Sequence, residues 1–385
     1  MKVVQLGCGI TGLVCVEHLS RNEAVDEIVL ADSKTGPAQC LVSRLKNDKL
    51  SFVRVDAKDP KAVKKVLRGT DLLISSIPSE LNMKVMEQAL AVGTNYIDYS
   101  VTQEALDDFE RVSKMCEDAG TTAVTGMGSD PGMSDVFARY AANKLDSVSE
   151  ARVRDGDNGS AEGYDLFTLW SPLDMLEEVT IPAAVFKEGK ITFLPPLHQK
   201  EIYNFPEPIG PLPVYNTTHE ETYLMPKFIK GIKNADFKIA IDDNFVAIAN
   251  MIRKLGMHSL KPIDVKGVKV RPLDVVVALT PSPVELIGKV KGSAGVVVEV
   301  VGMKGGKKAM MKVWTTLSHE KAYEMSGSNA TGYLVGTGGA VGAEMIIEGE
   351  VKGPGLFAPE MLPAEKYVAR LPAKKLEVKE QLEFL

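Results

Sequence analysis

Short apolar runs alternate with amphipathic stretches over the first third of the chain. Six of these runs have the length of strands: KVVQL, EIVLAD, SFVRVDA, DLLISSIP, NYIDYS and TTAVTGMG. Stretches between them, such as LVCVEHLSRN and EALDDFERVSKMCEDAG, place apolar residues at helical spacing. Strands that alternate with helices in this way are typical of a parallel sheet covered on both faces. The pattern therefore predicts an α/β domain with a doubly wound parallel sheet of the Rossmann type.

The pattern changes after residue 146. The stretches SEARVRDG and DLFTLWSP indicate strands, and DMLEEVTIPAAVFKEGKITFLPPL indicates a helix that leads into a hairpin at Gly189. Residues 195–226 are rich in Pro, Tyr and His, which predicts a shaped loop. A second hairpin is predicted in GVVVEVVGMKGGKKAMMKVWTTL, with its turn at Gly305-Gly306. This mixture predicts an α+β domain with a largely antiparallel sheet.

The glycine-rich stretch ATGYLVGTGGAVGAEMIIEGEV is helical in pattern and unlike the sheet before it. We expect it to return to the first domain. The predicted Rossmann domain thus comprises residues 1–131 and 326–385, and residues 132–325 form an inserted domain for substrate binding and dimerisation. The Lys/Glu-rich end AKKLEVKEQLEFL is compatible with a solvated tail and with a subunit contact.

Composition narrows the class of protein. A chain of 385 residues exceeds the usual size of one hydrophobic core, and its net charge of -6 offers no basic face for nucleic acid. No apolar run approaches the length of a membrane span, and MKVVQLGCG leads directly into a strand, so we expect a cytoplasmic protein without a signal peptide. The four cysteines have no metal-ligand spacing, and we expect reduced thiols and no metal site.

The first apolar run is followed at once by a glycine motif. Gly7 permits a tight turn, Gly9 lets the backbone approach a pyrophosphate, and Gly12 lets helix and strand pack closely. Asp32 ends the second run, 20 residues beyond Gly12, where a carboxylate accepts hydrogen bonds from a ribose and repels a 2′-phosphate. The motif predicts NAD as the cofactor, while Lys34 keeps NADP possible. The predicted phosphate loop is completed by Ile10 and Thr11.

Further polar residues end the later strands. Ligands of open α/β sheets bind beyond the carboxyl ends of the strands. We therefore assign Asp56 to the adenine side, with a solvated acid as the equal alternative, and include Asp98 in the cofactor site. The residues expected to line the nicotinamide ribose are Ser75, Ser76 and Pro78.

The sixth run leads into a second glycine loop, which contains Asp130-Pro131-Gly132. The proline is placed to begin the next helix. Asp130 could cap that helix or act as an acid/base beside the nicotinamide, and its position alone favours neither role.

Four motifs in order resemble the saccharopine dehydrogenase (glutamate-forming) and lysine 6-dehydrogenase superfamily. They are Gly7-x-Gly9-x-x-Gly12, Asp130-Pro131-Gly132, Trp170-Ser171-Pro172 and Ala330-Thr331-Gly332-Tyr333. The resemblance implies a Rossmann domain with an inserted domain and hydride transfer between NAD(P) and a C–N bond of a lysine-like substrate. It implies an acid/base role for Asp130, a second polar group from Tyr99 and a cofactor or substrate contact from Thr331. The residues it would place against substrate are Thr168, Trp170 and Ser171.

The resemblance also draws attention to His219-Glu220-Glu221 after Tyr215, since some carboxynorspermidine-type relatives have a similar His-x-Glu. His219 could transfer a proton near neutral pH, and Glu221 could bind a substrate ammonium. A polar surface loop is the equal alternative.

Arginines are few in the inserted half: Arg152, Arg154, Arg253 and Arg271 are all that lie between residues 141 and 330. Two substrate carboxylates would favour two bidentate arginines. The main hypothesis is therefore oxidative deamination of a small amino acid such as lysine at its ω-amine, by a homodimer. Reductive condensation of an amine with an aldehyde, as in saccharopine or carboxynorspermidine enzymes, is the first alternative. A non-catalytic dinucleotide-binding protein is the second.

Overall fold

The computed structural model describes residues 1–164 and 166–385, which divide into two compact units. The first unit comprises Met1–Asn143 and Tyr333–Val378, and the second comprises Lys144–Gly332 and Lys379–Leu385. Among the described residues, every helix is too short or too polar to cross a bilayer.

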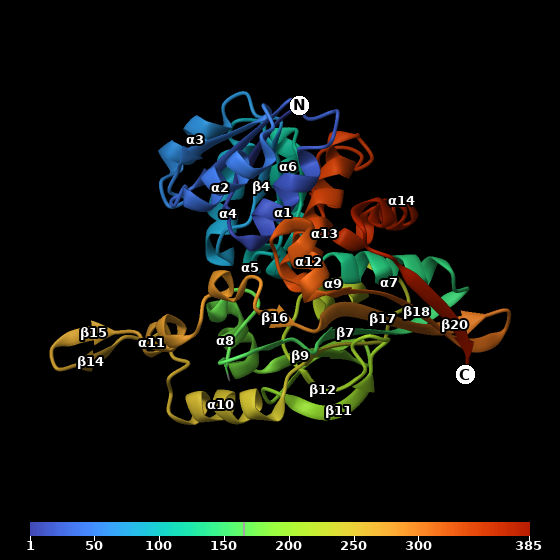
Figure 1. Ribbon diagram of the computed structural model, residues 1–385. Coiled ribbons are helices and arrows are strands. Elements are labelled where there is room, and N and C mark those ends of the chain that lie inside the picture. Colours follow the sequence, from blue (N-terminus) through green and yellow to red (C-terminus); the bar gives the residue numbers. More distant parts are fainter. Residues whose placement is uncertain (165) are drawn as a thin grey trace. The chain divides into compact units, whose positions relative to one another are not determined.

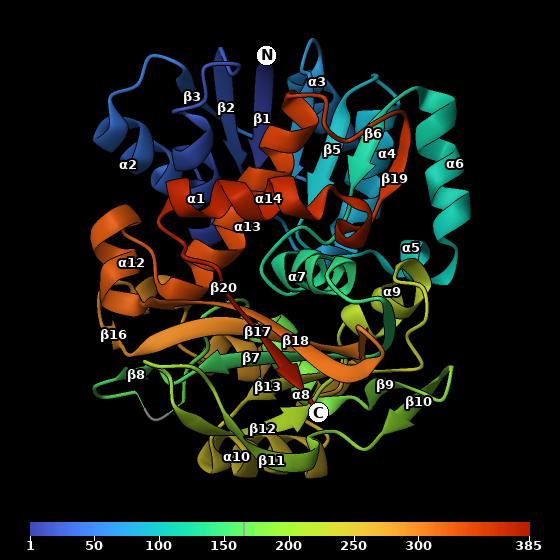
Figure 2. The same cartoon turned by 90° about the vertical axis from the view of Figure 1, so that its right-hand side faces the viewer.

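The first unit contains a sheet of seven parallel strands in the order β19-β6-β5-β4-β1-β2-β3 (Figure 2). The strand order reverses beside β1, as in the nucleotide-binding sheet that the pattern predicts, and the Rossmann fold is confirmed. The strands are β1 Lys2–Leu6, β2 Glu27–Asp32, β3 Leu50–Arg54, β4 Leu72–Ser75, β5 Asn95–Asp98, β6 Thr122–Val124 and β19 Gly355–Phe357.

Helices cover both faces of this sheet. From the N-terminal segment come α1 Ile10–Leu19, α2 Gly36–Leu45, α3 Pro60–Leu67, α4 Asn82–Leu90, α5 Gln103–Asp107, α6 Phe109–Ala119 and α7 Met133–Asn143. The returning segment supplies α13 Ala330–Ile347 and α14 Ala364–Arg370. Glycines let α13 lie close to its neighbours, because a β-carbon on Gly336 would stand 2.7 Å from the Val14 β-carbon and one on Gly338 would overlap the Gly128 carbonyl.

The second unit contains a mixed sheet of nine strands, whose main path is β10-β9-β13-β7-β17-β18-β20. Only β7 and β13 run parallel among its described pairs. The strands are β7 Ser147–Asp157, β9 Ala183–Lys187, β10 Lys190–Leu194, β11 His198–Asn204, β12 Pro211–Asn216, β13 Asn234–Ala240, β17 Ser293–Lys304, β18 Lys307–Ser318 and β20 Lys379–Phe384. Both predicted hairpins form, with turns at Gly189 and at Gly305-Gly306.

Helices and two small ribbons complete the second unit (Figure 1). The helices are α8 Pro172–Thr180, α9 Glu221–Phe228, α10 Asp243–Lys254, α11 Pro272–Leu279 and α12 His319–Ser326. The ribbons pair β8 Ser160–Ala161 with β16 Val290–Lys291, and β14 Ile263–Val265 with β15 Val268–Val270.

Two local predictions are wrong. Residues 195–226 are not a loop, because they form the strands β11 and β12 and the beginning of α9; β12 includes Pro211 and Pro213, and α9 includes Pro226. Residues 166–171 form no strand, although their apolar residues suggested one; Leu169 instead joins a small cluster with Leu286 and Val290. The first residue of that predicted strand, Asp165, lies outside the described residues.

The observed units differ from the predicted boundaries at both ends of the insertion. The helix α7 belongs to the first unit, so that unit continues to Asn143 rather than to residue 131, and it resumes at Tyr333 rather than at residue 326. The Lys/Glu-rich end is divided between the units: residues 373–378 belong to the first, whereas Lys379–Leu385 belong to the second, where β20 pairs with β18.

Candidate active site

The glycine loop between β1 and α1 fits a dinucleotide. Gly7 has φ of +91°, and a β-carbon there would overlap the Ser76 carbonyl. A β-carbon on Gly12 would stand 2.5 Å from Ser76 Oγ. At Gly9 no atom lies within 4 Å, and this residue begins α1 without a side-chain cap. The helix therefore presents its first N–H groups and the positive end of its dipole at an open backbone, the setting that binds a pyrophosphate.

Asp32 lies beside this loop, as predicted. One carboxylate oxygen accepts the Cys8 N–H at 2.6 Å and the other accepts the Lys34 N–H at 2.8 Å. Both contacts hold the carboxylate at the carboxyl end of β2, where it can accept ribose hydroxyls. The Cys8 thiol is buried, and burial raises its pKa to about 12, so it remains a neutral packing group.

A cation beside Asp32 was missed in the sequence. The strands β2 and β3 pair so that Asp32 and Arg54 are register partners, and paired residues of parallel strands share a face of the sheet. Arg54 is exposed, 22 positions further along the chain. Only the register of the sheet reveals a guanidinium suited to a 2′-phosphate at this position.

The other predicted cofactor residues have different surroundings. Ser76 donates to the Gly7 carbonyl at 2.7 Å and so stabilises the turn, while Ser75 is buried and donates to Asn82. Pro78 and Asp56 are exposed, and Asp56 accepts the Lys58 N–H. Ser75 is therefore a packing residue, whereas Pro78 and Asp56 are accessible to a cofactor.

Asp98 and Tyr99 are inside the first unit. Asp98 is fully buried and accepts hydrogen bonds from Tyr96 at 2.8 Å, Thr125 at 2.9 Å and the Gly126 N–H at 2.8 Å. Burial raises its pKa to about 7, although these donors act in the opposite direction. The Tyr99 hydroxyl is buried and its ring packs against Gly339 of α13. These surroundings favour structural roles over the predicted contacts with cofactor and substrate.

Asp130 lies in the glycine loop before α7 and is partly exposed. The Asp130-Pro131 peptide bond is cis. The Gly132 N–H donates to Asp135 at 2.8 Å, and the Ser134 N–H donates to the Ser129 carbonyl. Asp135 therefore accepts the N–H group beside the start of α7, and the acid/base role of Asp130 stays a prediction.

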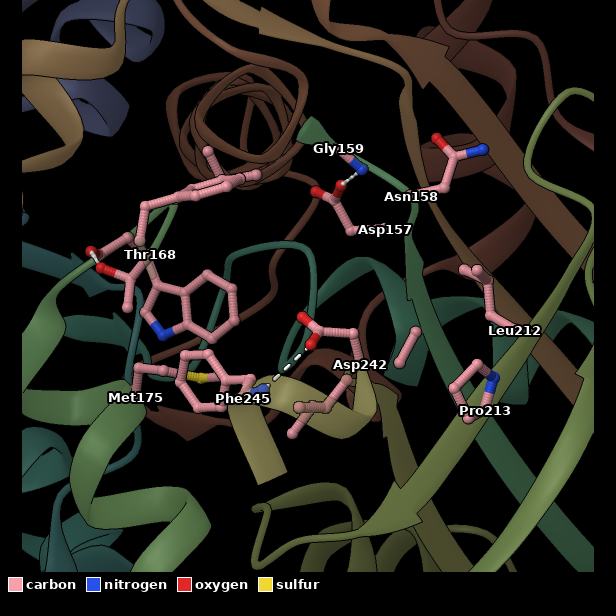
Figure 3. Close-up of a pocket in the computed structure, with 14 residues that line it drawn as sticks. Asp157, Asn158, Gly159, Thr168, Met175, Leu212, Pro213, Asp242 and Phe245 are labelled. Atoms are coloured by element: carbon pink, nitrogen blue, oxygen red, sulfur yellow. Dashed lines mark hydrogen bonds between the residues drawn. The ribbon is translucent and has the colours of Figure 1, made fainter. Parts of the chain in front are cut away.

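The second unit contains a pocket of about 290 Å³ (Figure 3). Its walls come from the end of β7, the segment before α8 with Met175 of α8, the beginning of β12, and the end of β13 that leads into α10. Aromatic and apolar side chains dominate, and two carboxylates, Asp157 and Asp242, line it as well. Among the described lining residues none is basic. The complete lining is Asp157, Asn158, Gly159, Phe167, Thr168, Leu169, Trp170, Met175, Leu212, Pro213, Ala240, Ile241, Asp242 and Phe245.

Asp157 is held by three donors. It accepts the Gly159 N–H at 2.6 Å, the Thr331 hydroxyl at 3.1 Å and His319 Nε2 at 3.1 Å. The Ala330 N–H donates to His319 Nδ1, so the proton of the neutral ring is on Nε2, directed at Asp157. Thr331 was expected to contact cofactor or substrate. Its hydroxyl instead contacts Asp157, a carboxylate that lines the pocket.

Asp242 provides the second carboxylate. One oxygen accepts the Phe245 N–H at 2.9 Å and caps α10, as the dashed line in Figure 3 marks. Thr168 and Trp170, the predicted substrate residues, line this pocket, and the Thr168 hydroxyl donates to the Trp170 carbonyl. Ser171 does not line it: its hydroxyl caps α8 by accepting the Asp174 N–H at 3.4 Å.

His219 and Glu221 form a separate cluster that does not line this pocket. The Glu221 carboxylate is fully buried and is hydrogen-bonded to His219 Nδ1, and the imidazole stacks on Phe237 at 3.9 Å between ring centroids. Burial alone disfavours the imidazolium. The carboxylates of Glu221, Glu220 and Glu178 outweigh burial and raise the pKa of His219 well above its ordinary range. The surface-loop alternative is therefore wrong for Glu221.

Three of the four arginines of the second unit form ion pairs with carboxylates within the unit, and the fourth, Arg253, donates to the Asn250 amide oxygen. Arg154 is buried and forms ion pairs with Asp236 at 2.9 Å and Glu201 at 3.1 Å. Arg152 is paired with Glu150, and Arg271 with Asp274. These three arginines are thus committed to protein carboxylates.

Two families match the chain in succession. Residues 3–124 match the one described as saccharopine dehydrogenase NADP binding domain, and residues 128–377 match the one described as saccharopine dehydrogenase C-terminal domain.

Curated relatives of nearly equal length are similar to this chain. Carboxynorspermidine synthase of Vibrio cholerae is 26% identical over 399 residues, covering 97% of this chain and 95% of that protein. Carboxyaminopropylagmatine dehydrogenase of Synechocystis is 25% identical over 379 residues, covering 96% and 95%. Saccharopine dehydrogenase [NADP(+), L-glutamate-forming] of Saccharomyces cerevisiae is 26% identical over 204 residues, covering 49% and 43%.

Solved structures share the fold. The apo saccharopine dehydrogenase of Saccharomyces cerevisiae superposes with a TM-score of 0.76 at 18% identity, covering 99% of both chains. The homospermidine synthase of Legionella pneumophila, solved with NAD, superposes with a TM-score of 0.72 at 14% identity, covering 99% of this chain and 91% of that one. Because the C-terminal domain match alone spans residues 128–377, more than half of the sequence, the chain belongs to the saccharopine dehydrogenase family of NAD(P)-dependent oxidoreductases.

Proposed function

We propose that the chain joins an aliphatic amine that carries a second positive charge to an aldehyde, with NAD(P)H as the reductant. The observation that carries this proposal is the pocket of the second unit, which places two carboxylates among aromatic side chains. An apolar pocket that carries negative charge selects an organic cation over a neutral or anionic ligand.

The reaction has two stages. The primary amine attacks the aldehyde carbon, and loss of water leaves a C=N bond. Hydride from NAD(P)H then adds to that carbon and a proton to the nitrogen, which gives a secondary amine and NAD(P)+. The protein must hold the two substrates together, supply and remove protons at the forming imine, and exclude competing water.

The pocket of the second unit provides groups that can hold the amine substrate in place. Asp157 is fixed by His319, Thr331 and the Gly159 N–H, so its charge is oriented before a ligand arrives. Asp242 uses one oxygen to cap α10, and a carboxylate has further lone pairs for an ammonium or guanidinium. Trp170 supplies an aromatic face for a cation.

Proton transfer is assigned to residues outside this pocket. Asp130 is partly exposed in a loop beside the dinucleotide-binding sheet. Protonated His219 is a second candidate, because its carboxylate partners favour the imidazolium that a general acid requires.

The relatives support condensation over lysine deamination. Two of those that match almost the whole chain are named for a carboxynorspermidine and a carboxyaminopropylagmatine, compounds in which an amine nitrogen joins two carbon chains. Arg152, Arg154 and Arg271 are already ion-paired with protein carboxylates, which fits an amine substrate better than a dicarboxylate substrate.

The test is a spectrophotometric assay at 340 nm with purified protein. The panel contains α,ω-diamines and ω-guanidino amines, each with the ω-aldehyde of an amino acid, and NADPH or NADH. The proposal predicts cofactor oxidation only when amine and aldehyde are both present. A monoamine of equal length is the matched control, and we expect its kcat/KM to be about 100-fold lower, from the lost ion pair and cation–π contact. Lysine-dependent reduction of NAD+ without an aldehyde would contradict the proposal in favour of deamination. Dinucleotide binding without turnover of any pair would favour the non-catalytic alternative.

A further inference from the structure

The segment that begins α13 contacts two walls of the pocket in the second unit. The Thr331 hydroxyl donates to the Asp157 carboxylate at 3.1 Å. The Asn329 amide nitrogen donates to the Leu169 carbonyl at 3.3 Å, and the next residue after Leu169 is Trp170. All five residues belong to the second unit. One short segment therefore holds both the carboxylate and the aromatic side chain to which the amine site is assigned.

His319 connects the same segment to Asp157. The histidine is 1% exposed, and its Nδ1 accepts the Ala330 N–H at 3.1 Å. The ring proton is therefore on Nε2, which lies 3.1 Å from Asp157 Oδ1. A buried imidazole that is hydrogen-bonded at both nitrogens is fixed in orientation and tautomer. The contact thus sets the direction of the Asp157 carboxylate.

All three donors to Asp157 are uncharged. They are the neutral His319 ring, the Thr331 hydroxyl and the Gly159 N–H, whose hydrogen bond is drawn in Figure 3. Asp236 of the same unit is different, because it is paired with the Arg154 guanidinium at 2.9 Å. A cation beside a carboxylate cancels much of the attraction that a positively charged ligand would feel, whereas neutral donors do not. Asp157 is therefore oriented and still carries its full charge.

We propose that His319 and Asn329 are positioning residues that set the preference of the pocket for an amine with a second positive charge. His319 directs the Asp157 carboxylate without neutralising it, and Asn329 holds the backbone beside Trp170. Neither His319 nor Asn329 is among the described lining residues, so each acts through a residue that is. They act in this way only if the amine occupies this pocket, so the inference rests on the proposed function.

Selectivity is the property that these contacts should control. The second charge of a diamine gains from Asp157 and Trp170 only if both groups are held at its position, since a misplacement of about 1 Å can cost about 100-fold in rate. A monoamine of equal length has no second charge to place. Loss of the positioning contacts should therefore reduce the preference for the diamine and leave the reaction of the monoamine nearly unchanged.

The experiment replaces His319 by two amides in the full chain. In His319→Gln the amide nitrogen takes the place of Nε2 and can donate to Asp157, but the acceptor of the Ala330 N–H is lost. In His319→Asn the amide oxygen takes the place of Nδ1 and can accept the Ala330 N–H, but the donor to Asp157 is lost. The measured quantity is the ratio of kcat/KM for an α,ω-diamine to kcat/KM for the matched monoamine. The KM for NAD(P)H and the melting temperature are measured beside it.

The two variants should change order between selectivity and stability. We expect His319→Asn to lower the ratio by about 10-fold without changing the KM for NAD(P)H, and His319→Gln to stay within about 3-fold of wild type. His319→Gln should have the lower melting temperature, because it leaves a buried N–H without its acceptor. A merely structural histidine would give one order for both measurements. In an Asp157→Asn background, His319→Asn should lower the ratio no further, because the group through which it acts is gone.

A second variant tests the other wall. Asn329→Ser retains an oxygen that can cap α13 by accepting the Gly332 N–H, but it loses the donor to Leu169. We expect the ratio to fall by about 5-fold. Ser318→Ala is the matched control, because it removes the cap of α12 next to His319. It should lower the melting temperature and leave the ratio unchanged.

Two failures can be told apart. A His319→Asn variant with the wild-type ratio, or a His319→Gln variant that loses as much as His319→Asn, overturns the inference while the proposed function stands. A wild type that does not prefer the diamine contradicts the proposed function, and the inference falls with it. The wild-type measurement alone decides between these cases.

Discussion

The cofactor loop of the first unit and the proposed amine pocket of the second are built in different ways. In the first unit the cofactor site depends on glycines that have no side chain. Gly7 and Gly12 allow close packing of the loop against Ser76, and Gly9 leaves the first N–H groups of α1 exposed to a phosphate. In the second unit the proposed amine site depends on side chains, and its two carboxylates, Asp157 and Asp242, come from the end of β7 and from the cap of α10. The backbone site suits a pyrophosphate, which all dinucleotides share, whereas a site made of side chains is suited to selecting one substrate.

Unlike the two carboxylates of the pocket, Asp98 of the first unit is fully buried inside its own unit, and it should make the stability of the protein depend on pH. Its pKa is about 7 when folded against an ordinary 3.8, so between these values the native state binds more protons than the unfolded state. Stability should therefore fall as pH rises from about 4 to 7, by up to about 4 kcal/mol. Urea unfolding across this pH range should show the decline in wild type and a flatter profile in Asp98→Asn. An equally steep profile in the variant would assign the pH dependence to other groups.

The backbone site is tested by adding atoms to it. Gly12→Val forces carbon atoms against the Gly7 carbonyl and Ser76 Oγ, and should weaken NAD(P)H binding by about 100-fold or more, measured by fluorescence titration. Gly36→Ala is the control, because no atom lies within 4 Å of that β-carbon. Wild-type affinity in Gly12→Val would show that the loop is not the cofactor site.

Two substitutions in and beside the loop before α7 distinguish a catalytic role from helix capping. Asp130→Asn should lower kcat by about 100-fold while leaving the melting temperature nearly unchanged. Asp135→Asn, which alters the acceptor of the Gly132 N–H, should instead lower the melting temperature. The acid/base role fails if the Asp130 variant loses stability and keeps its rate.

The side-chain site is tested by removing charge from it. Asp242→Asn retains an oxygen that can cap α10 and should raise the KM for the amine by about 30-fold, with little change in the KM for NAD(P)H. Asp59→Asn, at an equivalent cap of α3 in the first unit, is the matched control and should change neither constant. Equal effects of the two substitutions would mean that Asp242 only caps its helix.

The smallest expected effect concerns cofactor choice. Arg54→Ala removes the guanidinium in register with Asp32 and should lower kcat/KM for NADPH by about 10-fold while sparing NADH. A parallel loss with both cofactors would indicate a general electrostatic effect.

The sequence predicts the site in the first unit better than the site in the second. Gly7, Gly9, Gly12 and Asp32 lie within 26 residues of the chain, in the strand–glycine loop–helix–strand order that identifies a dinucleotide site. Asp157 and Asp242 have no such local signature, because the fold brings them together across 85 positions. Arg54 was missed for the same reason: only pairing of β2 with β3 places it beside Asp32.

The predictions of secondary structure were wrong where proline lies inside a strand or helix and where apolar residues pack outside any strand. Proline at position 211 begins β12, and Pro226 lies inside α9, yet both suggested a loop. The apolar residues of 166–171 suggested a strand, but they fill a small cluster with Leu286 and Val290. The strand β19 was also missed, since three residues, GLF, are too few to show a period.

The strand β19 has a consequence for synthesis of the protein. It pairs with β6, yet 230 residues separate Val124 from Gly355, and the ribosome must complete them first. Throughout that interval the edge of β6 presents unpaired N–H and C=O groups, which can template association with another nascent chain. A chaperone that shields this edge, or slow assembly of the N-terminal sheet until α13 and β19 emerge, would preserve the yield of folded protein.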